Sequence, residues 1–215
     1  MNQAVLVILI FTVIMSIKGF NDRIFFERFK FQVQAVLAGD KKRLLSSGFL
    51  HADFSHLAFN MYALYLFGGI TADSLGSLSF VVIYLGSLLA GGLYALYYHK
   101  DNPYYSAIGA SGAVSGVLIA SILLYPSNTY TFIFFPFIDI PGYVLGVGYI
   151  VYSIYGMKKQ LGNIGHSAHL GGAIGGFITT LLVFPSIIHL QPRVVVLVAI
   201  PIVLLGIFGR RLNPS

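Results

Sequence analysis

The sequence predicts an all-α membrane protein that crosses the bilayer several times. Two observations support this fold class. Hydrophobic residues make up 57% of the 215 residues and charged residues only 9%, whereas a soluble domain carries roughly 25% charged residues. The apolar residues also gather in runs long enough to cross the hydrocarbon core as helices, which takes about 20 residues. Lipid is therefore expected to be the solvent for much of the chain.

Seven apolar runs are each expected to form one spanning helix. They lie at about 4–20, 57–72, 78–98, 108–126, 140–157, 167–185 and 194–209. The first run is expected to be a retained helix, because Met1-Asn2-Gln3 lacks the basic residues of a signal peptide. No linker or repeat separates the runs, so residues 1–215 are expected to form a single membrane domain.

The connection between the first two runs, about 21–55, mixes basic and aromatic side chains. Its basic residues are Arg23, Arg28, Lys30, Lys41, Lys42 and Arg43. Phenylalanines are interspersed among them, as is typical of an element at the depth of the lipid headgroups. The aromatic segment Phe132–Ile138 is expected to lie flat in the same way. The net charge of +6 is therefore attributed to contact with membrane lipids, and no nucleic-acid partner is expected.

Polar side chains in the apolar runs are costly in lipid, so each indicates a functional position. His56 and Asn60 open the second run, Ser111 opens the fourth, and His166 and His169 open the sixth. Alternate spans run in the same direction across a bilayer. These side chains are therefore expected at one depth, near one face of the membrane.

Helical spacing predicts how the serine and one histidine meet. His169 shares a helix face with Gly172 and with the glycine at 176, and the fourth run has a similar pair at 112 and 116. Such small-residue stripes let two helix backbones approach closely. If the stripes pack together, Ser111 and His169 come within hydrogen-bond reach, as a nucleophile and its general base require.

The position of Ser111 also predicts donors for an oxyanion. The segment Gly109–Gly112 reads Gly-Ala-Ser-Gly, and a serine at a helix N-terminus lies beside unpaired N–H groups and the positive end of the helix dipole. These groups can stabilise the oxyanion of an acyl transfer. His56 and Asn60, four residues apart on one helix face, could add side-chain donors.

Three motifs in this order resemble those of the rhomboid intramembrane serine proteases. They are His56-Leu57-Ala58-Phe59-Asn60, Gly109-Ala110-Ser111-Gly112 and Ala168-His169-Leu170-Gly171-Gly172. The stretch Arg43–His51 is similar to the start of the family's catalytic region, and the resemblance covers about 40–185. It implies a six-helix rhomboid core at about 4–185, to which the run at 194–209 adds a seventh, C-terminal span.

The resemblance implies a serine endopeptidase that hydrolyses peptide bonds in or near transmembrane segments of other membrane proteins. Ser111 would be the nucleophile and His169 the general base, with no metal or other cofactor. The oxyanion-hole and substrate-binding residues would be His56, Asn60, Gly109, Ala110 and the backbone N–H of Ser111. The expected location is the inner membrane of a bacterial cell, as a multi-pass protein.

One departure from the family pattern is Ser115, four residues after the expected nucleophile. The family often has Tyr or Phe there, packed against the catalytic histidine. Another aromatic side chain is therefore expected to orient the imidazole of His169. Phe59, Tyr149 and Tyr152 are expected to gate lateral entry of the substrate.

Three other functions fit parts of the pattern. A non-proteolytic rhomboid-like protein that binds client membrane proteins is the main alternative, although such proteins typically lack the serine or the histidine. A metalloprotease is disfavoured because H-E-x-x-H is missing, the chain has no cysteine, and its single glutamate is Glu27. A transporter or channel would carry polar residues along a path across the membrane rather than at one depth.

Two signals disagree about which side of the membrane the site faces. All basic residues except Arg193 fall on the side of the site, which the positive-inside rule places toward the cytoplasm. The family resemblance usually implies the outer side. Both orientations therefore stay alternatives.

Overall fold

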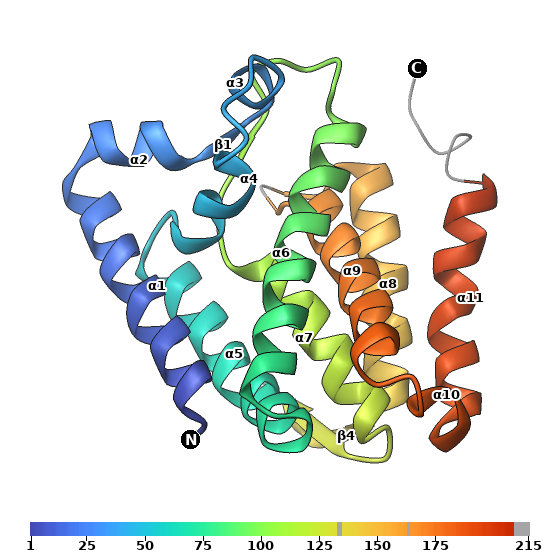
Figure 1. The fold of residues 1–215 in the computed structure, drawn as a ribbon. Helices are drawn as coiled ribbons and strands as arrows, with labels where there is room; N and C mark the ends of the chain where they lie inside the picture. Colours follow the sequence, from blue (N-terminus) through green and yellow to red (C-terminus); the bar gives the residue numbers. More distant parts are fainter. Residues whose placement is uncertain (133–134, 163, 209–215) are drawn as a thin grey trace.

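The protein is a bundle of long helices, described by a computed structural model over residues 1–132, 135–162 and 164–208 (Figure 1). The α-helices are α1 (Gln3–Asn21), α2 (Arg23–Phe29), α3 (Val33–Leu37), α4 (Arg43–Ser46), α5 (Phe54–Leu75), α6 (Ser77–Tyr98), α7 (Ser111–Leu124), α8 (Gly142–Lys159), α9 (His166–Val183), α10 (Ile187–Leu190) and α11 (Pro192–Phe208). A 3₁₀ helix, η1 (Ser47–Phe49), follows α4. The strands are β1 (Phe31–Gln32), β2 (Ser106–Ala107), β3 (Thr129–Phe132) and β4 (Phe135–Pro141).

Each predicted apolar run overlaps one long helix, namely α1, α5, α6, α7, α8, α9 or α11. Among the described helices, α1 and α6 combine the length and hydropathy of a membrane span, while α7 and α11 are apolar but shorter. The number of spans, including the seventh, therefore stays a prediction. Residue 209, where that run was expected to end, and the basic residues Arg210 and Arg211 lie outside the described residues.

The predicted helical fold is confirmed, and the connections add short strands that were not predicted. β1 pairs with β2, and β3 pairs with β4, in two small antiparallel sheets. Backbone N–H and C=O groups need partners wherever the helices stop, and these ladders supply them. The segment expected to lie flat, Phe132–Ile138, falls in the β3–β4 hairpin, with residues 133 and 134 outside the described part. Strands this short leave little alternation in the sequence to predict them.

Helix α7 lies at the centre of the bundle. Its residues 112–123 are all buried, and α5, α6, α8 and α9 pack around it. Fourteen residues rise only about 21 Å, less than the roughly 30 Å of a hydrocarbon core. The neighbouring helices enclose α7, so its length need not match the bilayer.

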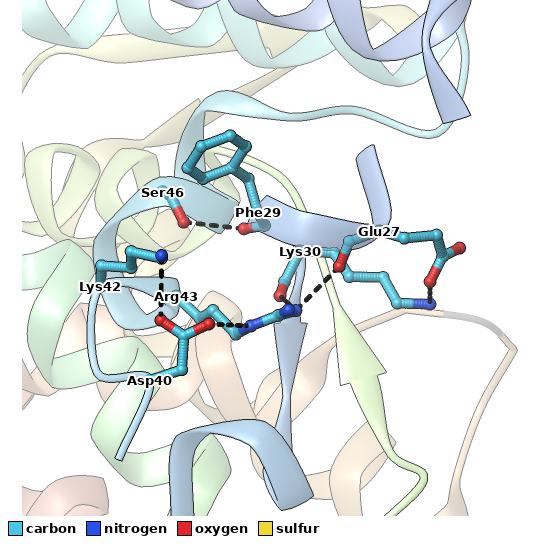
Figure 2. Close-up of polar contacts among 7 residues, drawn as sticks. All are labelled: Glu27, Phe29, Lys30, Asp40, Lys42, Arg43 and Ser46. Carbon is cyan, nitrogen blue, oxygen red and sulfur yellow. Dashed lines mark hydrogen bonds and ion pairs between the residues drawn. The ribbon is translucent and has the colours of Figure 1, made fainter. Parts of the chain in front are cut away.

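The connection from α1 to α5 folds at the end of the bundle opposite the β3–β4 hairpin (Figure 1). Figure 2 shows that the Arg43 guanidinium lies at the centre of the polar contacts within this connection. Arg43 donates to the carboxylate of Asp40 at 2.8 Å, and to the backbone carbonyls of Glu27 and Lys30 at 2.9 and 2.8 Å. These carbonyls lie at the end of α2, where the helix itself supplies no N–H partner. One side chain of α4 thereby holds the end of α2 and the turn at Asp40.

The same connection holds the chain that leads into α7. β1 pairs with β2, the strand just before α7, with Phe31 opposite Ala107. The N–H of Gly109 donates to the carbonyl of Ser47 at 3.0 Å. The start of α7 is therefore tied to the connection by backbone hydrogen bonds.

Candidate active site

A sharp turn places Ser111 at the first position of α7. Gly109 has a φ of +118°, in the region that residues with a side chain rarely adopt. A Cβ there would also lie 2.8 Å from two ring atoms of His56 and 3.6 Å from the Ser111 hydroxyl oxygen. Glycine is thus required for both backbone and space, and the His56 ring and the Ser111 hydroxyl border the same point.

The backbone N–H groups of this turn divide into occupied and free donors. Gly109 donates to Ser47, and Ala110 donates to a ring nitrogen of His51 at 3.3 Å. In the described part of the chain, no hydrogen bond is recorded for the N–H of Ser111. This donor lies at the positive end of the α7 dipole, where an anionic oxygen is stabilised. The predicted backbone donor is therefore free to receive a ligand.

His56 and Asn60 lie in the first two turns of α5. The Asp53 side chain caps this helix by accepting from the His56 N–H at 2.8 Å, and such a cap stabilises a helix by about 1 kcal/mol. The buried Asn60 amide donates to the His56 carbonyl at 2.9 Å. A side-chain amide has two N–H donors. One donor of Asn60 consequently remains for another acceptor.

The glycine stripes pack together as predicted. A Cβ on Gly172 would overlap the carbonyl oxygen of Gly112, and a Cβ on Gly176 would overlap the backbone of Gly116. The helices therefore touch backbone to backbone, which brings the start of α9, with His169, beside the start of α7. No hydrogen bond between Ser111 Oγ and His169 is recorded among the described residues. Catalytic pairs are often looser without substrate.

Helix α9 makes a second close contact that the sequence analysis missed. A Cβ on Gly171 would overlap the Tyr94 side chain of α6 and lie 2.8 Å from the Ala90 carbonyl. A Cβ on Gly91 would lie 2.7 Å from the carbonyl of Ala168. The pair Gly171 and Gly175, four residues apart, was a readable signal for this contact. The result is that α9 is fixed between α6 and α7.

His51 is a site-supporting residue that sequence reasoning did not single out. Its ring is fully buried, with Nδ1 2.8 Å from Ser16 Oγ and Nε2 accepting from the Ala110 N–H. Since Nε2 accepts, a neutral ring carries its proton on Nδ1 and donates to Ser16, whose hydroxyl donates to the Phe49 carbonyl at 3.0 Å. The partners are 35 and 59 residues away, so no local spacing reveals them. The sequence feature that could have indicated His51 is its position five residues before His56.

The aromatic residues expected at a gate do not share one environment. Phe59 and Tyr152 are exposed on the outside of the bundle, at 67% and 48%. Tyr149 is half-buried, and its ring faces that of His169. His166 is buried, with a ring nitrogen 3.2 Å from the Leu161 carbonyl. Gating by Phe59 and Tyr152 stays a prediction, whereas Tyr149 points inward.

A small cavity borders Ser111 and Gly109. Its volume is about 40 Å³, which is room for a water molecule or a small group. Its lining includes Ser47, Gly92, Gly112 and Ala168. Within the described ranges, no three His, Asp or Glu side chains are grouped as metal ligands.

Similar proteins come from bacteria and from mitochondria. The chain is 31% identical to the mitochondrial RHOMBOID-like protein 12 of Arabidopsis thaliana, over 72% of this chain and 50% of that protein. It is 34% identical to the mitochondrial Rhomboid protein 1 of Saccharomyces cerevisiae, over 64% of this chain and 40% of that protein. It is 35% identical to Rhomboid protease GluP of Bacillus subtilis, over 66% of this chain and 26% of that protein.

These matches span half or less of the relatives' own length. With mitochondrial proteins among them, they give no support to the expected bacterial inner membrane. The family model of the Rhomboid domain matches residues 38–186. This range includes all three motifs and the helices α5 to α9. The chain therefore belongs to the rhomboid family of membrane proteins.

Proposed function

We propose that this chain is an intramembrane serine endopeptidase that uses Ser111 and His169. The observation that supports the proposal most is the backbone contact between Gly172 and Gly112. It brings the starts of two helices together, with a hydroxyl on one and an imidazole on the other. The B. subtilis relative is named a protease, which supports the same reaction class.

In the proposed reaction, Ser111 Oγ attacks the carbonyl carbon of a peptide bond while His169 accepts the hydroxyl proton. The tetrahedral intermediate collapses as His169 gives that proton to the leaving amine. A water molecule, deprotonated by His169, then attacks the acyl carbon; the bond from that carbon to Ser111 Oγ breaks, and His169 returns the proton to Oγ. No metal or other cofactor is needed for these steps, so activity is expected to survive EDTA.

The negative oxygen of the intermediate would be stabilised beside Gly109. The free N–H of Ser111 is one donor, and the side chains of His56 and Asn60 are the others. Loss of one such donor typically slows turnover by about 10²–10³. The tie of Ala110 to His51 would keep the turn in place while charge develops. The cavity next to Ser111 could admit a small side chain of the substrate or the hydrolytic water.

The proposed substrates are transmembrane segments of other membrane proteins. Helix α7 is enclosed by its neighbours and begins at Ser111, so the peptide bond would have to reach a site inside the bundle. We further propose that α11, which packs against α8, is a seventh span. Membrane lipids are expected at the connection between α1 and α5.

The test is cleavage of a reporter that bears a helix-destabilised transmembrane segment, by purified protein in detergent or in vesicles. Wild type should cleave it, and Ser111→Ala should abolish cleavage with a nearly unchanged melting temperature. His169→Ala should have the same effect. Cleavage by Ser111→Ala at the wild-type rate would reject the proposed nucleophile.

The alternative is a rhomboid relative that binds clients without cutting them. The unformed hydrogen bond between Ser111 and His169 is the observation in its favour. This non-proteolytic alternative predicts that the reporter binds equally well to wild type and to Ser111→Ala, and that neither protein cuts the reporter. The same reporter experiment therefore separates the two functions.

A further inference from the structure

The imidazole of His169 has a nearly parallel aromatic neighbour. The Tyr149 ring of α8 lies 6.3 Å from it, centroid to centroid, with 22° between the ring planes. The other aromatic neighbour, His166, meets it edge-on at 6.2 Å and 72°. Both arrangements fall within the 4.5–7 Å over which aromatic rings attract. A ring on one face and an edge on another restrict how the imidazole can tilt.

The Tyr149 ring is itself held by its hydroxyl. Ser115 donates its hydroxyl proton to the Ser111 carbonyl at 2.6 Å, so its oxygen is left to accept. The Tyr149 hydroxyl lies 2.5 Å from that oxygen and must be the donor. The chain of donors thus runs from Tyr149 through Ser115 to the backbone of Ser111.

This geometry links both members of the proposed dyad to one side chain. The Tyr149 ring faces that of His169, and its hydroxyl reaches the first turn of α7 through Ser115. A short side chain at position 115 leaves room for the tyrosine, and Ser115 is itself buried. Because Ser115 replaces the family's usual aromatic residue, another aromatic side chain was expected to orient the imidazole. Tyr149 satisfies that requirement from a different helix.

We infer that Tyr149 is a positioning residue for His169, and that Ser115 sets the position of Tyr149. The inference rests on the proposed function, because the imidazole needs a fixed tilt only if it accepts the proton of Ser111. Tyr149 touches no reacting atom in this role. Its effect is on how often the imidazole lies in the productive orientation.

The test uses four variants: Tyr149→Leu, Tyr149→Phe, Ser115→Ala and, as a matched control, Tyr155→Leu. Tyr155 is on the same helix and is 54% exposed on the outside of the bundle. Tyr149→Leu removes the ring, whereas Tyr149→Phe keeps the ring and loses only the hydroxyl. Each variant is measured for reporter kcat and KM, for the rate of fluorophosphonate labelling at Ser111, and for melting temperature.

Tyr149→Leu should lower kcat and the labelling rate about 10- to 100-fold, the size expected when a catalytic group is misplaced by about 1 Å. KM should stay within about twofold, because the substrate contacts are unchanged. Tyr149→Phe and Ser115→Ala should each lose only a few-fold. Tyr155→Leu should label at the wild-type rate.

Three outcomes would count against the inference. A Tyr149→Leu protein that labels as fast as wild type would overturn this assignment and leave the proposed protease intact. A rise in KM at constant kcat would show that Tyr149 binds substrate instead. Wild-type protein that is folded but never labels would overturn the proposed function, and this assignment with it.

Discussion

Two regions of the molecule fix the proposed site by opposite means. The connection from α1 to α5 uses long charged side chains, with Arg43 bonded to a carboxylate and two carbonyls (Figure 2). Ser46 adds a bond from its hydroxyl to the Phe29 carbonyl at 2.8 Å. Where α7 and α9 approach most closely, Gly172 and Gly112 touch through their backbones rather than through side chains.

The solvent expected around each region, lipid headgroups and water for the connection and hydrocarbon for the bundle interior, accounts for the difference. Charged side chains are costly in hydrocarbon but not at headgroup depth, where water reaches them. Within hydrocarbon, helices associate through close backbone approach and packing. We therefore expect the contact between Gly172 and Gly112 to tolerate no added atom. The connection from α1 to α5 should tolerate changes to its exposed charges.

The largest expected effect is at Gly172. Gly172→Ala already places a methyl group on the carbonyl oxygen of Gly112, so α7 and α9 must separate, at a cost of about 1–3 kcal/mol for overpacking. Gly172→Val should cost more and abolish reporter cleavage. The control is Gly148→Ala, because nothing lies within 4 Å of a Cβ there. It should stabilise α8 by about 0.5–1 kcal/mol. Full activity in Gly172→Val would mean that the two helices do not meet there.

An intermediate effect is expected at Arg43. Its side chain is only 11% exposed, and Arg43→Gln leaves carbonyls at the end of α2 without their donor, which costs about 1–3 kcal/mol. The melting temperature in detergent should fall, and cleavage should slow because the connection holds the chain before α7. Lys42→Gln is the control, since Lys42 is 53% exposed with its carboxylate partner at 3.5 Å. That variant should change stability by about 0.5 kcal/mol or less. Equal losses of stability in Arg43→Gln and Lys42→Gln would show that the removal of one positive charge, rather than the loss of the Arg43 hydrogen bonds, destabilises the protein.

The smallest effect is the pH dependence of the connection. The hydrogen bond from Arg43 lowers the pKa of Asp40 below its usual 3.8, and that from Lys30 lowers the pKa of Glu27 below its usual 4.5. A lowered pKa contributes stability that is complete above the unfolded value and is lost as pH falls through the folded value. The melting temperature should therefore drop as pH falls below about 4.5.

Substitution of the two carboxylates tests the source of that drop. Asp40→Asn combined with Glu27→Gln should flatten part of the decline in melting temperature with acid. An identical decline in wild type and in the double variant would place the acid sensitivity elsewhere in the protein.

The sequence predicted what depends on local spacing. The seven apolar runs correspond to seven long helices, and the stripe at 172 and 176 packs on that at 112 and 116, because a helix fixes which residues share a face. Contacts set by the tertiary fold were not predictable in this way. The two-residue strands β1 and β2 are 74 to 76 residues apart in register and carry no periodic signal. His51 and Tyr149 have their partners in other elements, distant in the sequence.

The most direct test of the account is the chemical state of Ser111. Wild-type protein, His169→Ala and Ser111→Ala are each treated with a fluorophosphonate, and the labelled peptide is identified by mass spectrometry. The account predicts one adduct on wild type, at Ser111, none on Ser111→Ala, and labelling of His169→Ala slowed about 10²-fold or more, since a general base contributes roughly 10²–10⁴. Labelling of His169→Ala at the wild-type rate, or an adduct at another serine, would contradict the claim that Ser111 of α7 and His169 of α9 form a catalytic pair.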